Sequence, residues 1–319
     1  MTRQPVAPAA TSAARCAAPP DTPGAGRAAR PANRAPGRAQ AAASASIPLG
    51  PVTPHLHAPT PHRPVRVKQH WLSTQHQIVP HAHPWGQLTT SATGVVRLTV
   101  ADGTYIVPPS RALWVPPGVE HAVSVVEDAD LRTLYLHQPE GRCGPDVSRA
   151  QEPAWRECRV LEMSDLLRAL VLELDVRPDG AAPPPDAEAL QRERRIGTLV
   201  LDEMRRALPV RLGVAMPADK RLRALCEAVL EEPTRHATLA GWARDAAASE
   251  RTVARLFREE LKTTFLQWRQ QVLLAKALSM AARKLPMGTI ASELGYASAS
   301  AFTAMVRRSV GAPPSRFFA

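Results

Sequence analysis

Two arginines near the end of the chain, Arg251 and Arg255, have the side-chain type and the spacing needed to read DNA. They are four residues apart, so on a helix they would share one face. A guanidinium can donate two parallel hydrogen bonds to O6 and N7 of guanine, the commonest base-specific contact in the major groove. Either arginine could instead contact only a phosphate. What the pair contacts depends on the segment in which it lies.

The segment around these arginines is one copy of a repeated helical unit. Residues 239–260 and 289–308 each contain a short apolar helix, a tight turn, a serine and a second helix with a basic end. The apolar residues of the second helix recur at the i, i+3, i+4 spacing of a core-facing stripe. They are Val253, Leu256 and Phe257 in the first copy and Phe302, Met305 and Val306 in the second. Such a pair of helices places its second helix in the DNA major groove, so the repeat predicts a DNA-binding protein.

The charge of the chain agrees with that prediction. The formal net charge is +11 and the pI is about 10.3, values that suggest a polyanionic partner. Residues 217–319 hold 16 basic and 9 acidic side chains, whereas residues 67–216 hold 16 and 19. A basic surface that faces only solvent would give the same counts, so the repeat carries the prediction.

The length accommodates two ordinary domains after an unusual extension. Residues 1–62 are rich in Ala, Pro and Arg and poor in large apolar residues, so we predict disorder there. An organelle transit peptide, a later translation start and non-specific DNA attraction are alternatives. The four cysteines form no C-x-x-C pair, which argues against a cysteine zinc site or a disulfide framework. No apolar run approaches the roughly 18 residues that a membrane-spanning helix needs.

The middle of the chain has the pattern of a small β barrel or sandwich. Short β-rich runs alternate with turn signals from residue 65 to about residue 136. Asp102-Gly103 reads as a hairpin turn, and Pro116-Pro117-Gly118 as a corner. The candidate strands are residues 65–72, 87–92, 95–100, 105–107, 112–115, 122–126 and 131–137.

Histidines within these strands resemble the motifs of the cupin family. The spacing His81-x-His83-x-x-x-Gln87, followed by a glycine at position 94, resembles the first cupin motif, and Pro116-x-Gly118-x-x-His121 resembles the second. In cupins these positions converge in the barrel mouth and hold a divalent metal with three imidazoles and a carboxylate. The resemblance therefore implies a metal site at His81, His83, Gln87 and His121. Imidazole ligands favour Zn, Ni or Fe over Mg or Ca.

The chain departs from the cupin pattern in ways that bear on this site. Gln87 stands where the family usually has Glu, and a neutral amide is a weaker ligand for a divalent ion. Ser110 and Val125 replace the leading Gly and trailing Asn of the second motif. A hydrogen-bonded polar lining without metal is therefore the alternative. Four further residues could line a ligand cavity or be ordinary core or surface: Trp85, Arg97, Tyr105 and Trp114.

Two helices are predicted between the barrel and the repeat. Residues 163–174 carry one apolar stripe, and residues 186–207 carry a second after a proline-rich loop. A strand is expected near residues 155–160. The helices could pack on the barrel or on a second copy of the chain, and we expect a homodimer through them.

With both halves in view, the chain resembles AraC-type transcription regulators, in which a cupin sensor barrel is joined to a double helix-turn-helix domain. The resemblance covers residues 217–318 and includes Ser249-Glu-Arg-Thr-Val-Ala-Arg-Leu-Phe-Arg, a bridging helix near residues 265–285, and Ile290-Ala-Ser-Glu-Leu-Gly-Tyr. Ala247 replaces the usual turn glycine, so a positive φ there would be strained. Val306 stands where an aromatic residue is common.

The resemblance implies that both second helices enter successive major-groove segments on one face of DNA. Carried over by position, the base-facing residues are Arg251, Thr252, Ala254 and Arg255 in the first unit and Ala299, Ser300 and Thr303 in the second. The second set is small, so specificity should be weighted toward the first unit. Ser249 and Ser298 could cap their helices and present N–H groups to phosphate. Arg307 could contact phosphate or face solvent.

We therefore expect an α+β multidomain protein: a cupin-like β barrel followed by an all-α double helix-turn-helix domain. The expected domains are residues 1–62 (disordered), 63–150 (sensor barrel), 151–215 (connecting and dimerisation helices) and 216–319 (DNA-binding). The expected function is non-enzymatic transcription regulation in a bacterial cytoplasm. Its partners would be double-stranded promoter DNA, a small-molecule effector and, for an activator, RNA polymerase. A metal-dependent cupin enzyme of the dioxygenase kind with a helical appendage is the alternative, and a scaffold without sequence preference is a third.

Overall fold

The computed structural model describes residues 47–50, 54–210 and 212–318. Most of the extension predicted to be disordered, residues 1–46 and 51–53, lies outside the described residues. Within the rest of it, β1 (Ile47–Leu49) pairs in parallel with β3 (His76–His81), and Pro54–His57 form a 3-10 turn. The described secondary structure therefore begins before residue 63.

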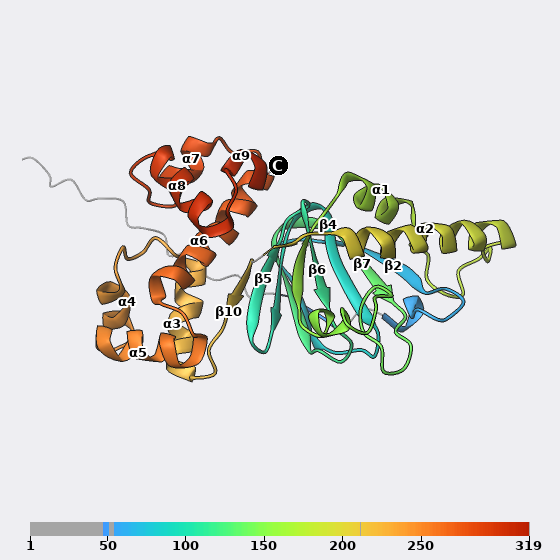
Figure 1. Cartoon of the computed structure of the whole chain (residues 1–319), viewed down its shortest axis with the longest axis horizontal. Coiled ribbons are helices and arrows are strands. Elements are labelled where there is room, and N and C mark those ends of the chain that lie inside the picture. Colours follow the sequence, from blue (N-terminus) through green and yellow to red (C-terminus); the bar gives the residue numbers. More distant parts are fainter. Residues whose placement is uncertain (1–46, 51–53, 211, 319) are drawn as a thin grey trace, which may run out of the picture. The chain divides into compact units, whose positions relative to one another are not determined.

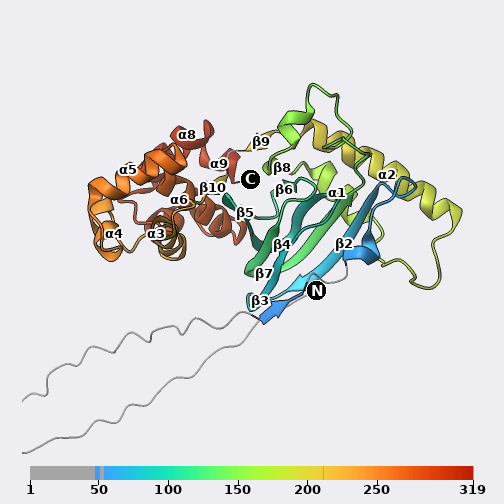
Figure 2. The same ribbon diagram turned by 90° about the horizontal axis from the view of Figure 1, so that it is seen from below.

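The described strands form one connected sheet that closes into a cupin-like barrel (Figure 1). β7 (His121–Leu136) pairs with β2 (Val65–Leu72), β3 and β4 (Gly86–Val100), and β4 also pairs with β5 (Gly103–Val107) and β6 (Arg111–Val115). β8 (Arg159–Glu162) and β9 (Pro209–Val210) extend the sheet beyond β6, and β10 (Gly213–Ala215) pairs with β5. Figure 2 shows β2, β3, β4 and β7 side by side.

β4 and β7 are each one long strand, although the sequence predicts two strands in each place. Their pairing continues through irregular register between Ser91 and Val96 instead of ending. Gly94 makes this possible, because its φ of +73° suits glycine and a Cβ there would lie 2.1 Å from the carbonyl oxygen of Asp128. The glycine that reads as a break in the sequence is a bulge within a continuous strand.

The two faces of β2 have different surroundings. Val65 and Val67 belong to an apolar cluster outside the barrel with Trp114 and Leu136. This cluster packs against α1 (Asp165–Glu173) and α2 (Ala187–Arg206) through residues such as Leu167, Leu170, Ile196 and Val200. Both helices lie within one or two residues of the predicted ranges and begin at side-chain caps, Ser164 and Asp186.

The carboxy-terminal region contains the predicted pairs of helices on either side of a buried helix (Figure 1). α3 (Lys220–Glu231), α4 (Leu239–Asp245) and α5 (Glu250–Leu261) pack around Trp242, Phe257 and Trp268. α7 (Met287–Glu293), α8 (Ala299–Val310) and α9 (Pro314–Phe317) pack around Ile290, Phe302 and Met305.

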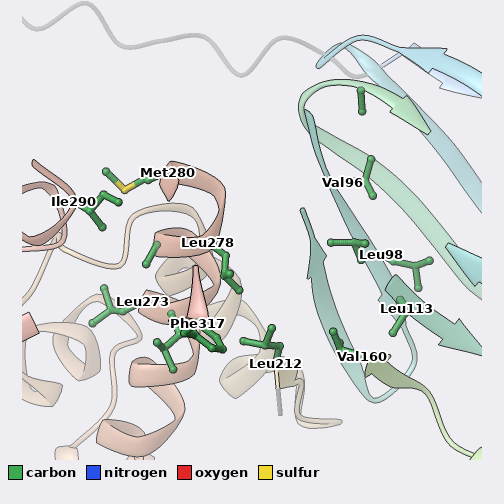
Figure 3. Packing of buried hydrophobic residues seen from close by; sticks show 14 of the residues in the cluster. Val96, Leu98, Leu113, Val160, Leu212, Leu273, Leu278, Met280, Ile290 and Phe317 are labelled. Atoms are coloured by element: carbon green, nitrogen blue, oxygen red, sulfur yellow. The ribbon is translucent and has the colours of Figure 1, made fainter. Parts of the chain in front are cut away.

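α6 (Phe265–Ala282) joins the two helical units and is apolar on more than one side. Phe265 and Val272 belong to the core of the first unit, and Leu274 and Leu278 to the cluster that includes the second. Figure 3 shows Leu273, Leu278 and Met280 with Ile290 and Phe317, and Val96, Leu98 and Leu113 on the barrel strands. Among the helices described, none is long and apolar enough to cross a membrane.

Candidate functional site

The turns of the two helix-turn-helix units have the same backbone. Ala247 has a φ of +49° and Gly295 a φ of +77°, so both adopt the left-handed conformation. Ala247 N–H donates to Arg244 O (3.0 Å) and Gly295 N–H donates to Ser292 O (2.9 Å). The next amides, of Ala248 and Tyr296, donate to Ala243 O and Ala291 O, each at 2.9 Å. The positive φ expected at Ala247 is therefore confirmed.

The second helix of each unit begins at the same kind of cap. Ser249 Oγ accepts a hydrogen bond from the Thr252 amide at 3.1 Å, and Ser298 Oγ accepts one from the Ala301 amide at 3.1 Å. A serine side chain in this position satisfies an amide that has no partner within the helix. The capping role predicted for both serines is confirmed, and it aligns residue 249 with residue 298.

This alignment pairs the buried residues of α5 and α8. Val253 corresponds to Phe302, and Phe257 to Val306; each of the four is at most 2% exposed. The valine and the phenylalanine have thus exchanged places between the units. Phe257 packs edge-on against Phe265 and Trp268, whereas Phe302 contacts Tyr296 and Phe318. Both stripes face the core as predicted, and this leaves the opposite helix faces to solvent.

The outer face of α5 carries the two arginines. Arg251 and Arg255 are both exposed, as is Thr252, whereas Ala254 is half-buried. Arg255 forms an ion pair with Glu259, one turn further along the helix. Arg251 has no hydrogen bond or ion pair from its side chain to any other described residue. The sequence spacing correctly predicted that Arg251 and Arg255 share one face of the helix. The Arg255–Glu259 ion pair was missed, although its i, i+4 spacing could have predicted it.

The corresponding face of α8 is small and neutral. Ala299 and Ser300 are exposed and Thr303 is half-buried. Ser300 occupies the position of Arg251, and Ala304 that of Arg255. Positive charge appears only in the last turn, at Arg307 and Arg308, both exposed. The first unit therefore presents cations at the start of its second helix, and the second unit does so at the end.

The barrel brings together the predicted metal ligands. One nitrogen from each of His81, His83 and His121 can be chosen so that all three lie within 4.8 Å of one another. His81 ends β3 and is paired in register with His121 at the start of β7, and Gln87 lies in β4. The Gln87 Oε1 atom lies 2.9 Å from His83 Nε2. Residues from two sequence motifs are thus gathered into one cluster.

The three imidazoles use the same ring nitrogen for the same kind of backbone contact. Their Nδ1 atoms lie 2.9 to 3.0 Å from backbone carbonyl oxygens of Val79, Trp85 and Val119. Each Nδ1 therefore carries the proton and donates it, which leaves a lone pair on each Nε2. His121 Nε2 is buried and has no hydrogen-bond partner among the described residues. Outer hydrogen bonds of this kind are typical of histidines that bind metal.

The contacts of His83 agree with a neutral ring. Its Nδ1–H donates to Trp85 O. When the Gln87 amide is turned by 180°, its N–H donates to His83 Nε2 and its oxygen accepts from the Thr89 hydroxyl. Burial lowers the pKa of His83, and it lowers the pKa of His121 to about 4, so both rings are neutral near pH 7. The neutral Nε2 atoms of His83 and His121 and the oxygen of Gln87 can each bind a divalent cation, so the residues present fit a metal.

The other residues suggested as cavity lining have different positions. Trp85 stacks on His83 with ring centroids 5.0 Å apart, so it lies beside the cluster. Trp114 is fully buried in the outer cluster, where its Nε1–H donates to Trp155 O at 2.8 Å. Arg97 lines a different cavity, with Ser124 and Val126, and Tyr105 does not line the cavity next to the histidines. Cys143, Cys158 and Cys226 are free thiols.

Comparisons with known proteins agree with this division of the chain. A family model described as AraC-like ligand binding domain matches residues 63–194, and one described as helix-turn-helix domain matches residues 242–319. The HTH-type transcriptional regulator NimR of Escherichia coli K12 is 31% identical over 239 residues, which are 75% of this chain and 81% of NimR. The arabinose operon regulatory protein of Salmonella typhimurium is 27% identical over 156 residues, 44% of this chain and 56% of that protein.

A solved structure of ToxT from Vibrio cholerae aligns with 80% of this chain and 98% of its own, with a TM-score of 0.32 and 10% identity. The sequence relatives therefore carry the assignment.

Proposed function

The chain belongs to the AraC-type family of transcription regulators, with a ligand-binding domain and a helix-turn-helix DNA-binding domain, and we propose that it reads its operator chiefly through α5. In this proposal Arg251 and Arg255 contact bases. Thr252 and Ala254 contact the DNA beside these two arginines. The observation that carries the proposal is the difference between two helices with equivalent caps and turns, of which only α5 has cations on its exposed first turns.

The proposal assigns a supporting role to α8. The small residues on the corresponding face of α8 can make apolar contacts or single hydrogen bonds, but they cannot form the bidentate hydrogen bonds that an arginine makes with guanine. These residues are Ala299, Ser300 and Thr303. The first-turn amides of α5 and α8 that the serine caps leave free, together with Arg307, would contact phosphates and fix the register on the duplex.

Selection of binding sites from random DNA tests the assignment. The full chain and its Arg251→Ala and Arg255→Ala variants would be selected in parallel, and affinities for the resulting sites measured at fixed salt. We expect each variant to lose preference at one base position, with a cost of about 1–3 kcal/mol there. Arg221→Ala, which removes an exposed arginine of α3, is the matched control. Equal weakening on every DNA sequence would assign the arginine to the backbone instead.

We further propose that His81, His83, His121 and Gln87 hold a divalent metal of the Zn, Ni or Fe kind in the barrel. The support is the convergence of three imidazoles, the unpartnered Nε2 of His121 and the Gln87 amide that lies beside His83. When bound, such an ion would supply a fixed positive charge that can hold an oxygen atom of the effector. The chain's residues orient the site through the carbonyl contacts of the three Nδ1 atoms.

Cobalt absorption spectroscopy tests the metal site. Titration of the chelator-treated protein with Co²⁺ should give visible d–d bands that Zn²⁺ removes. His121→Ala should abolish these bands, and Gln87→Glu should strengthen binding by adding a carboxylate. His137→Ala, a half-buried histidine outside the cluster, should change nothing. A spectrum that survives His121→Ala would reject the assignment and leave the cluster as a hydrogen-bonded lining.

A third proposal is that the chain forms a homodimer through α1 and α2. Large apolar side chains remain exposed on these helices: Leu166 (52%), Leu172 (47%) and Leu199 (48%). Such exposure on adjacent helices is typical of a protein interface. Light scattering at micromolar concentration should report twice the monomer mass, and Leu199→Asp should halve it. Leu208→Asp, at another exposed leucine, is the control. A monomeric wild-type protein would overturn the proposal.

A further inference from the structure

Lys68 is directed into the barrel by the alternation of β2. Val65 and Val67 pack in the cluster outside the barrel, so the residues between and after them face the interior. Lys68 is paired in register with Thr133 of β7, and His70 with Leu131. The lysine is 8% exposed, although its side chain has an ionisable end. The strand therefore places an ionisable side chain in the barrel interior.

A small cavity lies beside this lysine. Its volume is about 30 Å³, which is room for one or two water molecules and also for a carboxylate group. The polar side chains that line it are Lys68, His70, His81, Thr133 and Tyr135, with Pro54, Ile78 and Leu131 as the apolar part. β2, β3 and β7, which supply nearly all of these residues, are neighbours in the sheet (Figure 2).

The positive charge in this cavity has no counterion. Lys68 Nζ has no hydrogen bond or ion pair within the described part of the chain, whereas the neighbouring Arg66 pairs with Asp179 at 2.7 Å. Burial lowers the pKa of Lys68 to about 8, and no carboxylate offsets that effect. Although the side chain is largely buried, its Nζ atom is not among the fully buried atoms without a partner, so water reaches the charge and a ligand in the cavity could replace that water. Features of this kind are expected at functional sites.

We propose that this cavity binds the carboxylate of a small monoanionic ligand, with Lys68 Nζ as its ion-pair partner. Thr133 and Tyr135 line the same cavity, and hydroxyl groups of this kind can donate hydrogen bonds to carboxylate oxygens. A single lysine without an ion-pair partner among the described residues matches a single negative charge, and the cavity has room for a carboxylate group. The inference rests on the proposed sensing role of the barrel, because His81 belongs both to this cavity and to the histidine cluster.

Acetate and acetamide are the probes that test it, since the two have the same planar shape and differ in charge. Thermal unfolding of the chelator-treated full chain would be followed at rising millimolar concentrations of each, at constant ionic strength. Acetate should raise the melting temperature progressively, as a ligand of the native state does, and acetamide should not. Equal shifts from both probes, or none from acetate, would overturn the proposal without requiring any variant.

Substitutions then locate the binding group. Lys68→Met should weaken acetate binding at least about tenfold, the effect of losing a hydrogen bond to a charged group. Lys68→Arg should retain binding, and Lys220→Met, at an exposed lysine of α3, should leave it unchanged. Acetate binding by Lys68→Met at the wild-type affinity would reject the assignment. Binding seen only in Zn-loaded protein and unaffected by Lys68→Met would also reject it while supporting the metal site. Operator affinity, measured separately, reports on the DNA-binding proposal alone.

Discussion

In the first helix-turn-helix unit the turn residue is Ala247 and α5 begins with exposed arginines. Its buried phenylalanine, Phe257, lies eight residues after the serine cap. In the second unit the turn residue is Gly295 and α8 begins with small residues. Its buried phenylalanine, Phe302, lies four residues after the serine cap. The caps and turn hydrogen bonds are the same in both. One backbone therefore supports two surfaces, and the comparison separates what builds the unit from what it contacts.

The largest effect should come from the exchanged core residues. Phe302 and Phe257 are each fully buried, so Phe302→Ala and Phe257→Ala should each cost about 3–5 kcal/mol of local stability. Each phenylalanine packs on a different set of rings, so we expect faster amide exchange in α7 and α8 for the first variant and in α4 and α5 for the second. Hydrogen-exchange mass spectrometry measures this. Equal exchange throughout both units in either variant would show that they unfold together.

The contrast in DNA reading can be tested by transplanting a residue. Ser300 occupies in α8 the position of Arg251 in α5, and it is exposed. Ser300→Arg should create a new preference for guanine at one position, worth about 1–3 kcal/mol. Binding-site selection with the wild type and the variant would detect the additional base. Ala304→Arg makes the same change at the equivalent of Arg255. An affinity gain that is equal on all sequences would mean that α8 does not reach base edges.

The turns should respond in opposite senses to an exchange of their residues. Around Gly295 an added Cβ would meet only Thr234 Cγ2, at 3.7 Å, so the cost of Gly295→Ala arises from its positive φ. We expect a loss of about 1–2 kcal/mol in unfolding free energy. Ala247→Gly removes the same strain and increases the freedom of the unfolded chain, so it should stabilise by less than about 1 kcal/mol. Denaturant unfolding measures both. Destabilisation by Ala247→Gly would contradict the strain.

The sequence predicted these units well because their signals are local. The serine caps, the core stripes and the strained position of Ala247 all follow from residues within a few positions of one another. In the barrel, residues that are close in the sequence do not by themselves determine where the strands begin and end. The strand from His76 to His81 was missed because its polar and proline residues suit a strand only when β7 and β1 supply partners. Gly94 reads as a break, since its fit against Asp128 depends on β7.

Orientation was the other property that local patterns did not determine. The alternation along β2 identifies two faces, one with Val65 and Val67 and one with Arg66 and Lys68. A common assumption would turn the charged face to water. Because α1 and α2 cover the apolar face from outside, the charged face becomes the interior. The histidine cluster was predicted from family resemblance, whereas Lys68 was not, since no motif includes it.

The smallest effect concerns the pair that distinguishes Arg255 from Arg251. Glu259 holds Arg255 in an exposed ion pair, an interaction worth at most about 1 kcal/mol, so DNA can replace it. Glu259→Gln should free the guanidinium and remove a negative charge beside the duplex. We expect DNA affinity to rise by less than about tenfold, and the slope of log K against log salt to steepen by roughly 0.9 if one phosphate contact is gained.

Glu250→Gln removes an equal charge from the first turn of the same helix and is the matched control. If both variants raise affinity equally with unchanged salt slopes, the effect is one of net charge, because neither substitution has then created a contact. If Glu259→Gln instead sharpens the preference at the base position assigned to Arg255, the ion pair competes with base reading. In that case Glu259 sets how strongly the first unit exceeds the second in specificity.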